Sequence, residues 1–178
     1  MEKNEIIGEK YVIKLVSDPI DVNEAVVSVN DLDCGAVSLF MGNTRRTEAG
    51  DQSGRQVLSL DYEAYYSMAL KEMQTIVEQN CRSNAVKKCY IAHRLGRVGV
   101  GQTSLLIACS APHRTEAHEM VMKLLNQIKE KVPIWKKINY TTDKGSDEVT
   151  NRPEMSEWSD KSEAFWLKHK HWINFSKL

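Results

Sequence analysis

A proline at the end of a long helical pattern restricts the fold of this chain more than any other residue. It lies in the segment 129–137, which reads Lys-Glu-Lys-Val-Pro-Ile-Trp-Lys-Lys. Proline has no N–H group to donate, and it pushes the residue before it out of helical geometry. The amphipathic pattern that starts near His113 is therefore predicted to end at Val132, a helix about 30 Å long at 1.5 Å per residue.

The lysines of this segment have different predicted surroundings. Lys129 falls in the last helical turn, where its charge complements the negative end of the helix dipole. Past the proline, an extended chain alternates between two faces. These faces are Ile134, Lys136 and Ile138 on one side, and Trp135, Lys137 and Asn139 on the other. A lysine held against apolar surface has a lowered pKa and becomes a usable base or nucleophile, unless its stem alone is buried and its ammonium group stays in water.

Composition narrows the class of function. The 178 residues fit one domain with one core, and the 24 basic and 24 acidic side chains give a net charge of zero. A nonspecific nucleic-acid binder usually has a strong basic excess, so no nucleic-acid partner is expected, whereas a specific anion pocket remains compatible. No charged-then-apolar leader opens the chain, and no apolar run approaches the ~18 residues of a membrane span, so no membrane association is expected.

The cysteines and histidines give no sign of a metal site. The cysteines are Cys34, Cys81, Cys89 and Cys109, without a C-x-x-C pair. They lie in apolar patterns, which is typical of reduced core residues in a cytosolic protein rather than of a disulfide framework or a zinc site. His113 and His118 are five positions apart, off the i, i+4 spacing of a helical metal pair. We therefore expect a cytoplasmic protein with no bound metal or cofactor.

Hydrophobic periodicity predicts an α+β fold, a mixed and largely antiparallel sheet with about three helices packed on it. The expected strands are 11–16, 34–41, 57–62, 86–93 and 103–109, and the expected helices are 21–29, 67–81 and 113–132. Residues 1–8 are polar and are expected to fray. The run 34–41 is nearly all apolar, which predicts a strand buried on both faces. Asp18 is the expected N-cap of the first helix, and Pro112 is expected in the first turn of the longest one.

Residues 93–101 contain three glycines, at Gly96, Gly99 and Gly101. This spacing does not predict a dinucleotide-binding loop, because no helix follows it. It predicts a hairpin with tight turns leading into the strand 103–109. His93 and Arg94, at the end of the preceding strand, are candidates to face a site, although a structural histidine is the commoner outcome.

Two sets of basic side chains occupy positions that are typical of residues that bind an anion. Arg45 and Arg46 follow a predicted strand in a glycine-flanked loop, but surface loops carry such pairs equally often without a function. Arg114 lies at a helix start, where a cation opposes the dipole unless an anion such as phosphate sits between it and the free N–H groups. His113 is expected either to donate to the same anion or to cap the strand-to-helix turn.

The C-terminal part has a different composition, polar and charged at first and then rich in aromatic residues. We expect a single α+β domain over residues 1–140, and over 141–178 a polar loop followed by a tryptophan-rich tail. The aromatic residues of this tail are Trp158, Phe165, Trp166 and Trp172. Leaving them in water is unfavourable, so they are expected to dock on the domain or on a partner chain, with a nucleic-acid surface as the weaker alternative.

Several motifs together resemble the large, catalytic subunit of molybdopterin synthase. They are Phe40-Met41-Gly42-Asn43-Thr44-Arg45, Tyr62-Glu63-Ala64-Tyr65, His93-Arg94-Leu95-Gly96, Ser110-Ala111-Pro112-His113-Arg114, and Lys129 through Pro133-Ile134-Trp135-Lys136-Lys137. They run in order between about Asp33 and Tyr140, and the last of them is the most specific. The resemblance implies an α+β fold of the α/β hammerhead type. The segment 141–157 is longer than the usual closing loop of that family, and the extension beyond Trp166 has no counterpart in it.

The resemblance implies a sulfurtransferase. A ubiquitin-like small subunit with a C-terminal Gly-Gly thiocarboxylate would deliver two sulfurs in turn to cyclic pyranopterin monophosphate, formerly precursor Z. The product would be the dithiolene of molybdopterin in molybdenum cofactor biosynthesis. Two large subunits would form a central homodimer and bind one small subunit at each end, which makes a heterotetramer. No metal is implied, because molybdenum enters after this step.

The resemblance also implies roles for individual residues. Lys129 and Lys136 would be catalytic, Lys129 beside the thiocarboxylate tail and Lys136 as a general acid/base on the pterin or as a stabiliser of developing charge. The residues that would bind the substrate are Asn43, Thr44, Arg45, His113, Arg114, Lys129, Lys136, Lys137 and Ile138. Many relatives carry an acidic residue where Ile138 stands here. His113 and Arg114 would reach in from the other protomer.

Two other functions are compatible with parts of the sequence. The first is a noncatalytic adaptor that binds a ubiquitin-like Gly-Gly tail, and the joint presence of Lys129, Lys136 and Arg45 argues against it. The second is a nucleotide or nucleic-acid binder that uses Arg45, Arg46, Arg114 and the tryptophans of the tail. The zero net charge argues against this second function.

Overall fold

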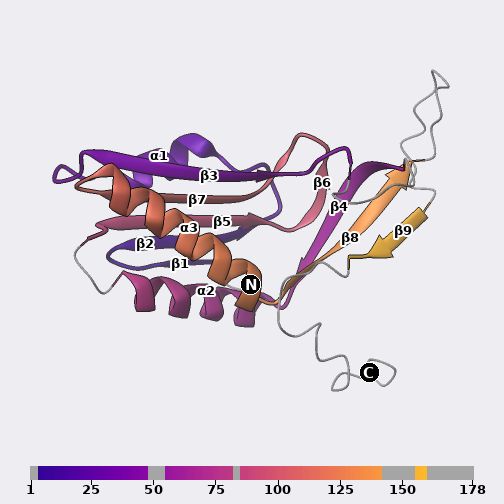
Figure 1. Ribbon diagram of the computed structural model, residues 1–178. Helices are drawn as coiled ribbons and strands as arrows, with labels where there is room; N and C mark the ends of the chain where they lie inside the picture. Colours follow the sequence, from indigo (N-terminus) through magenta and orange to yellow (C-terminus); the bar gives the residue numbers. More distant parts are fainter. Residues whose placement is uncertain (1–3, 48–54, 82–84, 142–154, 160–178) are drawn as a thin grey trace.

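The computed structural model describes residues 4–47, 55–81, 85–141 and 155–159 (Figure 1). In these ranges a five-stranded sheet has the order β1-β2-β5-β7-β3, and a four-stranded sheet has the order β6-β4-β8-β9. The first sheet contains β1 (Glu5–Ile7), β2 (Tyr11–Val16), β3 (Ala36–Asn43), β5 (Lys88–Arg94) and β7 (Thr103–Ala111). The second contains β4 (Gln56–Ala64), β6 (Gly96–Gly99), β8 (Ile134–Thr141) and β9 (Met155–Trp158). The helices are α1 (Val22–Val29), α2 (Tyr66–Asn80) and α3 (Arg114–Lys131).

The predicted fold class is confirmed. Among the described strands, β2 and β5 pair in parallel and the other pairs are antiparallel, so the architecture is mixed and largely antiparallel. The strands divide into two sheets, however, where a single sheet was expected. The chain crosses from β5 of the first sheet to β6 of the second at Gly96, whose φ of 75° is a conformation that glycine adopts without strain.

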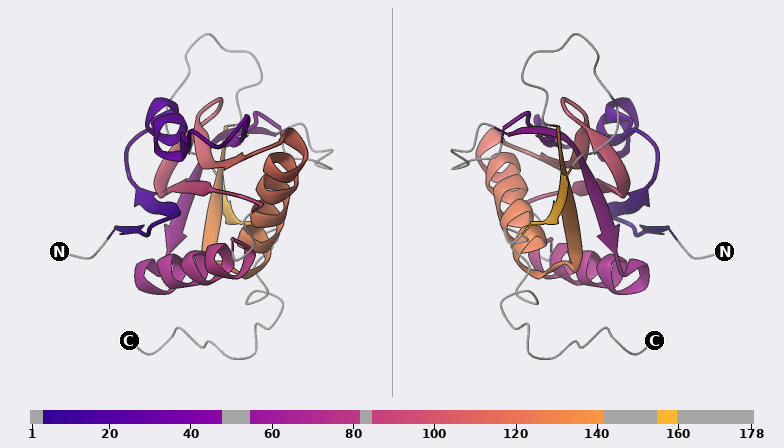
Figure 2. Two further views of the ribbon diagram at one scale, coloured as in Figure 1. Left: turned by 90° about the vertical axis from the view of Figure 1, so that its left-hand side faces the viewer. Right: turned by 90° about the vertical axis from the view of Figure 1, so that its right-hand side faces the viewer.

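The five-stranded sheet is covered on both faces, as the two side views show (Figure 2). Ile107 and Cys109 of β7 pack in the main core with α2 and α3. The alternating residues Leu106 and Ala108 pack in a second cluster with α1. Because the central strands are buried on both sides, β5 and β7 read as nearly continuous apolar runs.

The break at Pro133 occurs where it was predicted. The helix α3 ends at Lys131, and Val132 is its C-cap with an extended ψ of 128°. The N–H of Val132 still donates to the carbonyl of Ile128 at 3.0 Å, and the chain then continues directly into β8. The proline therefore turns the chain from the last turn of α3 into the second sheet.

Two helices begin within one residue of the predicted positions, but the residues predicted to start them were wrong. Asp21 caps α1, and its Oδ1 accepts hydrogen bonds from the N–H groups of Asn23 at 2.8 Å and Glu24 at 3.3 Å. Asp21 therefore supplies the cap, not Asp18, which lies too early in the chain to reach these N–H groups. Pro112 lies before the N-cap of α3, not in its first turn, because β7 stays paired with β3 as far as Ala111.

Three predictions about strands also need correction. Residues 5–7 form β1, paired antiparallel with β2, instead of fraying. The strand β3 is not buried on both faces: Val37, Leu39 and Met41 are 42%, 36% and 43% exposed. It is an edge strand, and α1 packs over β5 and β7 instead. Finally, the glycine-containing segment 93–101 was predicted to form a hairpin leading into β7. Its strand β6 instead pairs with β4 of the second sheet.

The cysteines are free thiols, and three of them are core residues as predicted. Cys81, Cys89 and Cys109 are buried, with 3.2 Å between the Sγ atoms of Cys81 and Cys89. The hydrogen bond with Cys89 and burial raise the pKa of the Cys81 thiol, which makes it a poor nucleophile. Within the described ranges, none of the helices has the length and apolar character that crossing a membrane requires.

Candidate functional site

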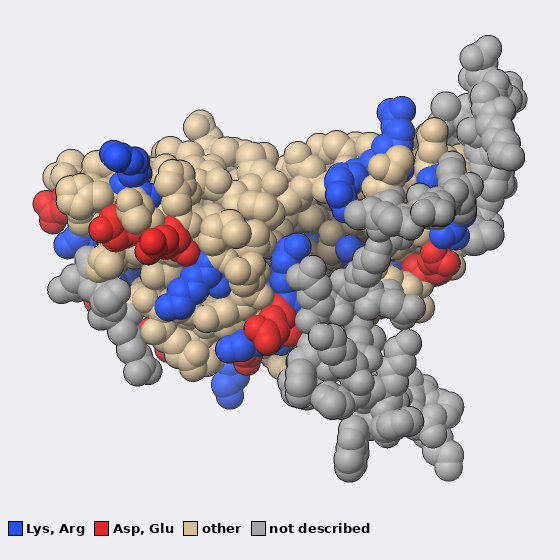
Figure 3. Space-filling model, viewed as in Figure 1, with Lys and Arg blue, Asp and Glu red and all other residues tan. Residues whose placement is uncertain are grey.

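A cavity of about 720 Å³ opens where the ends of β3 and α3 meet the strands β4 and β8. It brings together five of the predicted site residues from three segments of the chain. These are Asn43, Arg45, Lys129, Lys136 and Ile138. In the space-filling view, Lys and Arg side chains border the hollow near the middle of this face (Figure 3).

The antiparallel pairing of β4 with β8 places Lys136 in the cavity wall. Lys136 lies opposite Tyr62, and Ile138 lies opposite Leu60. All four side chains line the cavity, in agreement with the alternation that the sequence predicted. Trp135 was expected on the other side but also lines the cavity, at the start of β8 just after the bend.

The bend at Pro133 brings the two candidate catalytic lysines to one cavity from different elements. Lys129 is exposed in the last turn of α3, whereas Lys136 is half-buried in β8. The cavity wall also contains Arg45, and no aspartate or glutamate is among the described residues that line it. A wall with cations and no carboxylates suits an anionic ligand.

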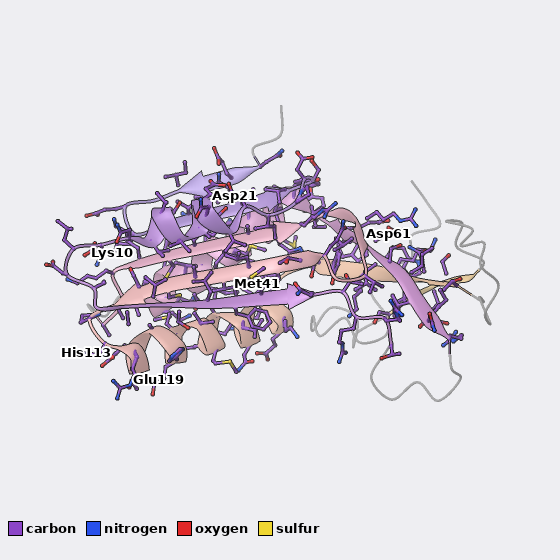
Figure 4. The ribbon with its side chains drawn as sticks, turned by 90° about the horizontal axis from the view of Figure 1, so that it is seen from above. Lys10, Asp21, Met41, Asp61, His113 and Glu119 are labelled. Carbon is purple, nitrogen blue, oxygen red and sulfur yellow. The ribbon has the colours of Figure 1, made fainter. Side chains whose placement is uncertain are left out.

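Four predicted substrate-binding residues do not line the cavity. Arg114 and Lys129 are fifteen positions apart on α3, which corresponds to about 22 Å along the helix axis. His113 lies next to Arg114 at the far end of the molecule, away from Met41 of the cavity wall (Figure 4). Both residues are exposed. Within one protomer they therefore cannot reach a ligand that contacts Lys129.

The remaining two, Thr44 and Lys137, lie close to the cavity but point elsewhere. Thr44 is only 3% exposed, and its N–H donates to the carbonyl of Gln102 at 3.0 Å. It thus anchors the backbone between two cavity residues. Lys137 follows Lys136 in β8, so its side chain is on the opposite face of the strand. In the strand register it lies opposite Asp61 of β4 and opposite Trp158 of β9.

Three further polar residues line the cavity, Tyr62, His93 and Ser104. Of these, the sequence offered only His93 as a candidate to face a site, and it assigned no role in binding or catalysis to any of the three. The rings of Tyr62 and His93 meet edge to face, with 5.0 Å between centroids and 70° between planes. Burial raises the pKa of Tyr62, and a hydrogen bond with Ser104 opposes this. His93 and Tyr62 stood in recognisable motifs, but Ser104 lies in an apolar run and gave no signal.

Burial lowers the pKa of His93 from its usual 6.5 to about 4. The unfolded chain therefore binds this proton near pH 6.5, and the folded chain binds it only near pH 4. The stability that the neutral ring provides is complete above pH 6.5 and is lost as the pH falls toward 4. We expect this histidine alone to lower the free energy of unfolding by about 3 kcal/mol across that window.

Urea denaturation at several pH values measures this effect. His93→Gln should show a shallower loss of stability between pH 6.5 and 4 than the wild type, because glutamine does not titrate in this window. Parallel curves for wild type and His93→Gln would show that His93 is not held neutral.

Together, the two sheets, the three helices and the cationic cavity define an α+β protein with a pocket for a small anionic ligand. The described residues contain no group of three or more His, Cys, Asp or Glu side chains that could hold a metal ion. The sequence pattern of the family described as MoaE protein matches residues 15–131. The chain belongs to the MoaE family.

Individual relatives agree with this assignment. The chain is 45% identical over 152 residues to the molybdopterin synthase catalytic subunit of Drosophila melanogaster, covering 84% of this chain and 40% of that protein. It is 39% identical over 163 residues to the subunit of that name from Culex quinquefasciatus, covering 91% of this chain and 95% of that protein. The chain therefore spans about two fifths of the length of the Drosophila relative and nearly all of the Culex one.

A solved structure is also similar. The crystal structure of molybdopterin synthase from Staphylococcus aureus has a TM-score of 0.69 and 30% sequence identity to this chain. The similarity covers 83% of this chain and 96% of that one. The similarity therefore extends over most of the chain rather than over one motif.

Proposed function

We propose that this chain is the catalytic subunit of a molybdopterin synthase, a sulfurtransferase of molybdenum cofactor biosynthesis. The observation that supports it most is the cavity that Lys129, Lys136 and Arg45 line together without a described carboxylate. Its substrate is cyclic pyranopterin monophosphate, and its partner is a ubiquitin-like small subunit with a C-terminal Gly-Gly thiocarboxylate. Both the phosphate and the thiocarboxylate are anions, which a cationic wall attracts.

Lys129 and Lys136 differ in exposure, which supports assigning Lys129 to the tail of the small subunit and Lys136 to the pterin. Lys129 is exposed at the end of α3, so it can meet a tail that arrives from solvent. Lys136 is half-buried among Tyr62, Ile134 and Ile138, so it can act on a bound pterin. The surrounding apolar side chains keep water away, which protects the thiocarboxylate from hydrolysis. Asn43 and Ile138 complete the wall.

A second copy of the chain is needed to complete the site. The apolar side chains of Val37, Leu39 and Met41 form an exposed row on the edge strand β3, as in a surface that another chain covers. We propose a homodimer in which His113 and Arg114 of one copy reach the substrate bound by the other. With one small subunit at each end, the assembly is a heterotetramer.

Arg114→Ala is expected to weaken substrate binding and to change the rate of the chemical step much less. Loss of a charge-assisted contact to phosphate raises KM by about tenfold to a hundredfold. The matched control is Arg46→Ala, since Arg46 is exposed and does not line the cavity. Steady-state dithiolene formation measures both variants. A KM for Arg114→Ala equal to the wild-type value would contradict the phosphate assignment.

The C-terminal part has a separate proposed role. We propose that residues 1–140 form the catalytic domain and that 141–178 form a loop and a tail that dock on it or on the partner. The described piece, β9, pairs with β8, and the N–H of Ser159 donates to the carbonyl of Lys136 at 3.0 Å. Trp158 on this strand is 53% exposed. Phe165, Trp166 and Trp172 lie outside the described residues.

One reconstitution tests the function against its two alternatives. The chain is incubated with a thiocarboxylated ubiquitin-like partner and the pyranopterin, and dithiolene formation is measured. Binding of the Gly-Gly tail without turnover would favour the noncatalytic adaptor, and binding of nucleic acid without the tail would favour the other alternative. The free buried thiols are compatible with the cytoplasmic location that we propose, because that compartment keeps thiols reduced.

A further inference from the structure

The cavity wall contains a histidine whose hydrogen-bonding state follows from its contacts. His93, in β5, is 6% exposed and lines the cavity. Its Nδ1 lies 2.9 Å from the backbone carbonyl oxygen of Arg94. A carbonyl oxygen only accepts, so Nδ1 must carry the hydrogen. In the neutral ring the other nitrogen, Nε2, then presents a lone pair.

The lone pair of Nε2 is available to a ligand. Among the described residues Nε2 makes no hydrogen bond. The ring hydrogen-bonds through Nδ1 to the Arg94 carbonyl and makes a T-shaped contact with the ring of Tyr62. In the described chain, the fully buried side-chain polar atoms without a hydrogen-bond partner are Ser110 Oγ and Glu116 Oε2, and Nε2 of His93 is not among them. Since it has no partner and is not enclosed, it opens onto the cavity that His93 lines.

The polar groups around His93 are otherwise satisfied. The hydroxyl of Tyr62 shares a hydrogen bond with Ser104, and Ser104 Oγ donates to the carbonyl of Gly42 at 3.1 Å. The side-chain oxygen of Asn43, also in the wall, accepts from Thr103 Oγ1 at 2.8 Å. The hydroxyl hydrogen of Ser104 is therefore used by the Gly42 carbonyl and is not donated to Nε2.

The cations of the cavity wall cannot accept a hydrogen bond, whereas His93 can. The charged nitrogens of Arg45, Lys129 and Lys136 donate hydrogen bonds and do not accept them. A pterin ring carries amide-type N–H and amino groups, which need acceptors when they leave water. A carboxylate in this place would weaken the attraction of the cations for the anionic substrate. A neutral imidazole accepts a hydrogen bond without adding negative charge.

We propose that His93 binds the substrate by accepting a hydrogen bond at Nε2 from an N–H group of its heterocycle, and that Tyr62 is a positioning residue that holds the imidazole ring. This inference rests on the proposed function and adds a residue to its site. The T-shaped contact with Tyr62 and the hydrogen bond from Nδ1 to the Arg94 carbonyl hold the imidazole ring of His93 from two directions. The acceptor therefore has a defined position before the substrate enters.

A nitrogen NMR experiment on the wild-type chain tests the hydrogen bond directly. The chain is labelled with ¹⁵N-histidine, and long-range correlations are recorded before and after addition of cyclic pyranopterin monophosphate without the small subunit. The Nε2 resonance of His93 should move upfield as it accepts the hydrogen bond. His118, whose Nδ1 is 2.8 Å from Ser38 Oγ, is the control and should not move. Binding that shifts other signals and leaves His93 Nε2 unchanged overturns the proposal.

Kinetics of two variants give a second readout. His93→Leu removes the acceptor and should raise KM by about tenfold, with a smaller change in kcat. His93→Gln keeps an amide oxygen near the position of Nε2 and should recover most of this loss. Equal KM values for wild type and His93→Leu overturn the proposal. If His93→Leu does not fold, the NMR result on the wild type decides.

The outcomes separate this inference from the proposed function. Turnover by the wild type together with an unshifted His93 Nε2 overturns the role of His93 and leaves the synthase assignment intact. No turnover and no binding of the pterin by the wild type overturns the synthase assignment and the role of His93 with it. Tyr62→Ala, in contrast to Tyr62→Phe, should reproduce part of the KM increase, because alanine lacks the ring that holds the imidazole.

Discussion

Replacing Lys136 by alanine should lower the rate of dithiolene formation by about a thousandfold or more, while assembly with the small subunit stays nearly unchanged. The side chain is half-buried in β8, lines the cavity and lies opposite Tyr62. A proton-transferring group in such a place contributes about 10² to 10⁴ in rate, and a group that stabilises developing charge contributes a similar amount. Single-turnover formation of the dithiolene measures the loss, and size-exclusion chromatography measures assembly.

Lys136→Arg separates the two roles that remain open for this residue. Arginine keeps the positive charge but does not release its proton near neutral pH. Substantial activity of Lys136→Arg would therefore assign charge stabilisation, and activity as low as that of Lys136→Ala would assign acid/base chemistry. Lys123→Ala, on the exposed face of α3, is the control and should behave as wild type. An active Lys136→Ala chain would remove Lys136 from the mechanism.

Leu124→Ala should lower the free energy of unfolding by about 3 to 4 kcal/mol. Leu124 is 0% exposed on the inner face of α3, in the core cluster that α2, α3 and the five-stranded sheet share. Truncation removes buried apolar surface and leaves a cavity, and both effects are unfavourable. Urea denaturation followed by circular dichroism gives the free energy.

The neighbouring exposed residue supplies the control for this measurement. Lys123→Ala should change the free energy of unfolding by less than about 0.5 kcal/mol, because Lys123 points into solvent. A loss below about 1 kcal/mol for Leu124→Ala would mean that α3 does not pack on the sheet as described. The position of Lys129, in the last turn of the same helix, depends on that packing.

The parts of the fold that follow from local rules were predictable. Pro133 removes a donor and excludes helical geometry at Val132, so the end of α3 was predicted within one residue. The alternation of Ile134, Lys136 and Ile138 follows from the geometry of any extended chain, and it was enough to place Lys136 on a shared face with apolar side chains. These features need only the residue and its near neighbours in sequence.

Burial of individual strands was not predictable in the same way. The run from Cys34 to Met41 is apolar, but the identity of its neighbours decides whether its second face is covered. In the structure β3 is an edge strand, so Val37, Leu39 and Met41 stay exposed. The sequence pattern of an edge strand that another chain covers is the same as that of a central strand.

The sequence alone determined the break at Pro133, the types of most elements and the residue kinds that suit an anionic ligand. The tertiary structure determined which of these residues meet, because the end of α3, the strand β8 and the loop after β3 lie around one cavity that Arg45, Lys129 and Lys136 line, whereas Arg114 is about 22 Å from Lys129 along α3. It also determined that the pKa of His93 is lowered, since the cost of charging a side chain depends on the water that the surrounding elements exclude. Distances and desolvation arise between segments far apart in the chain, and no local pattern encodes them.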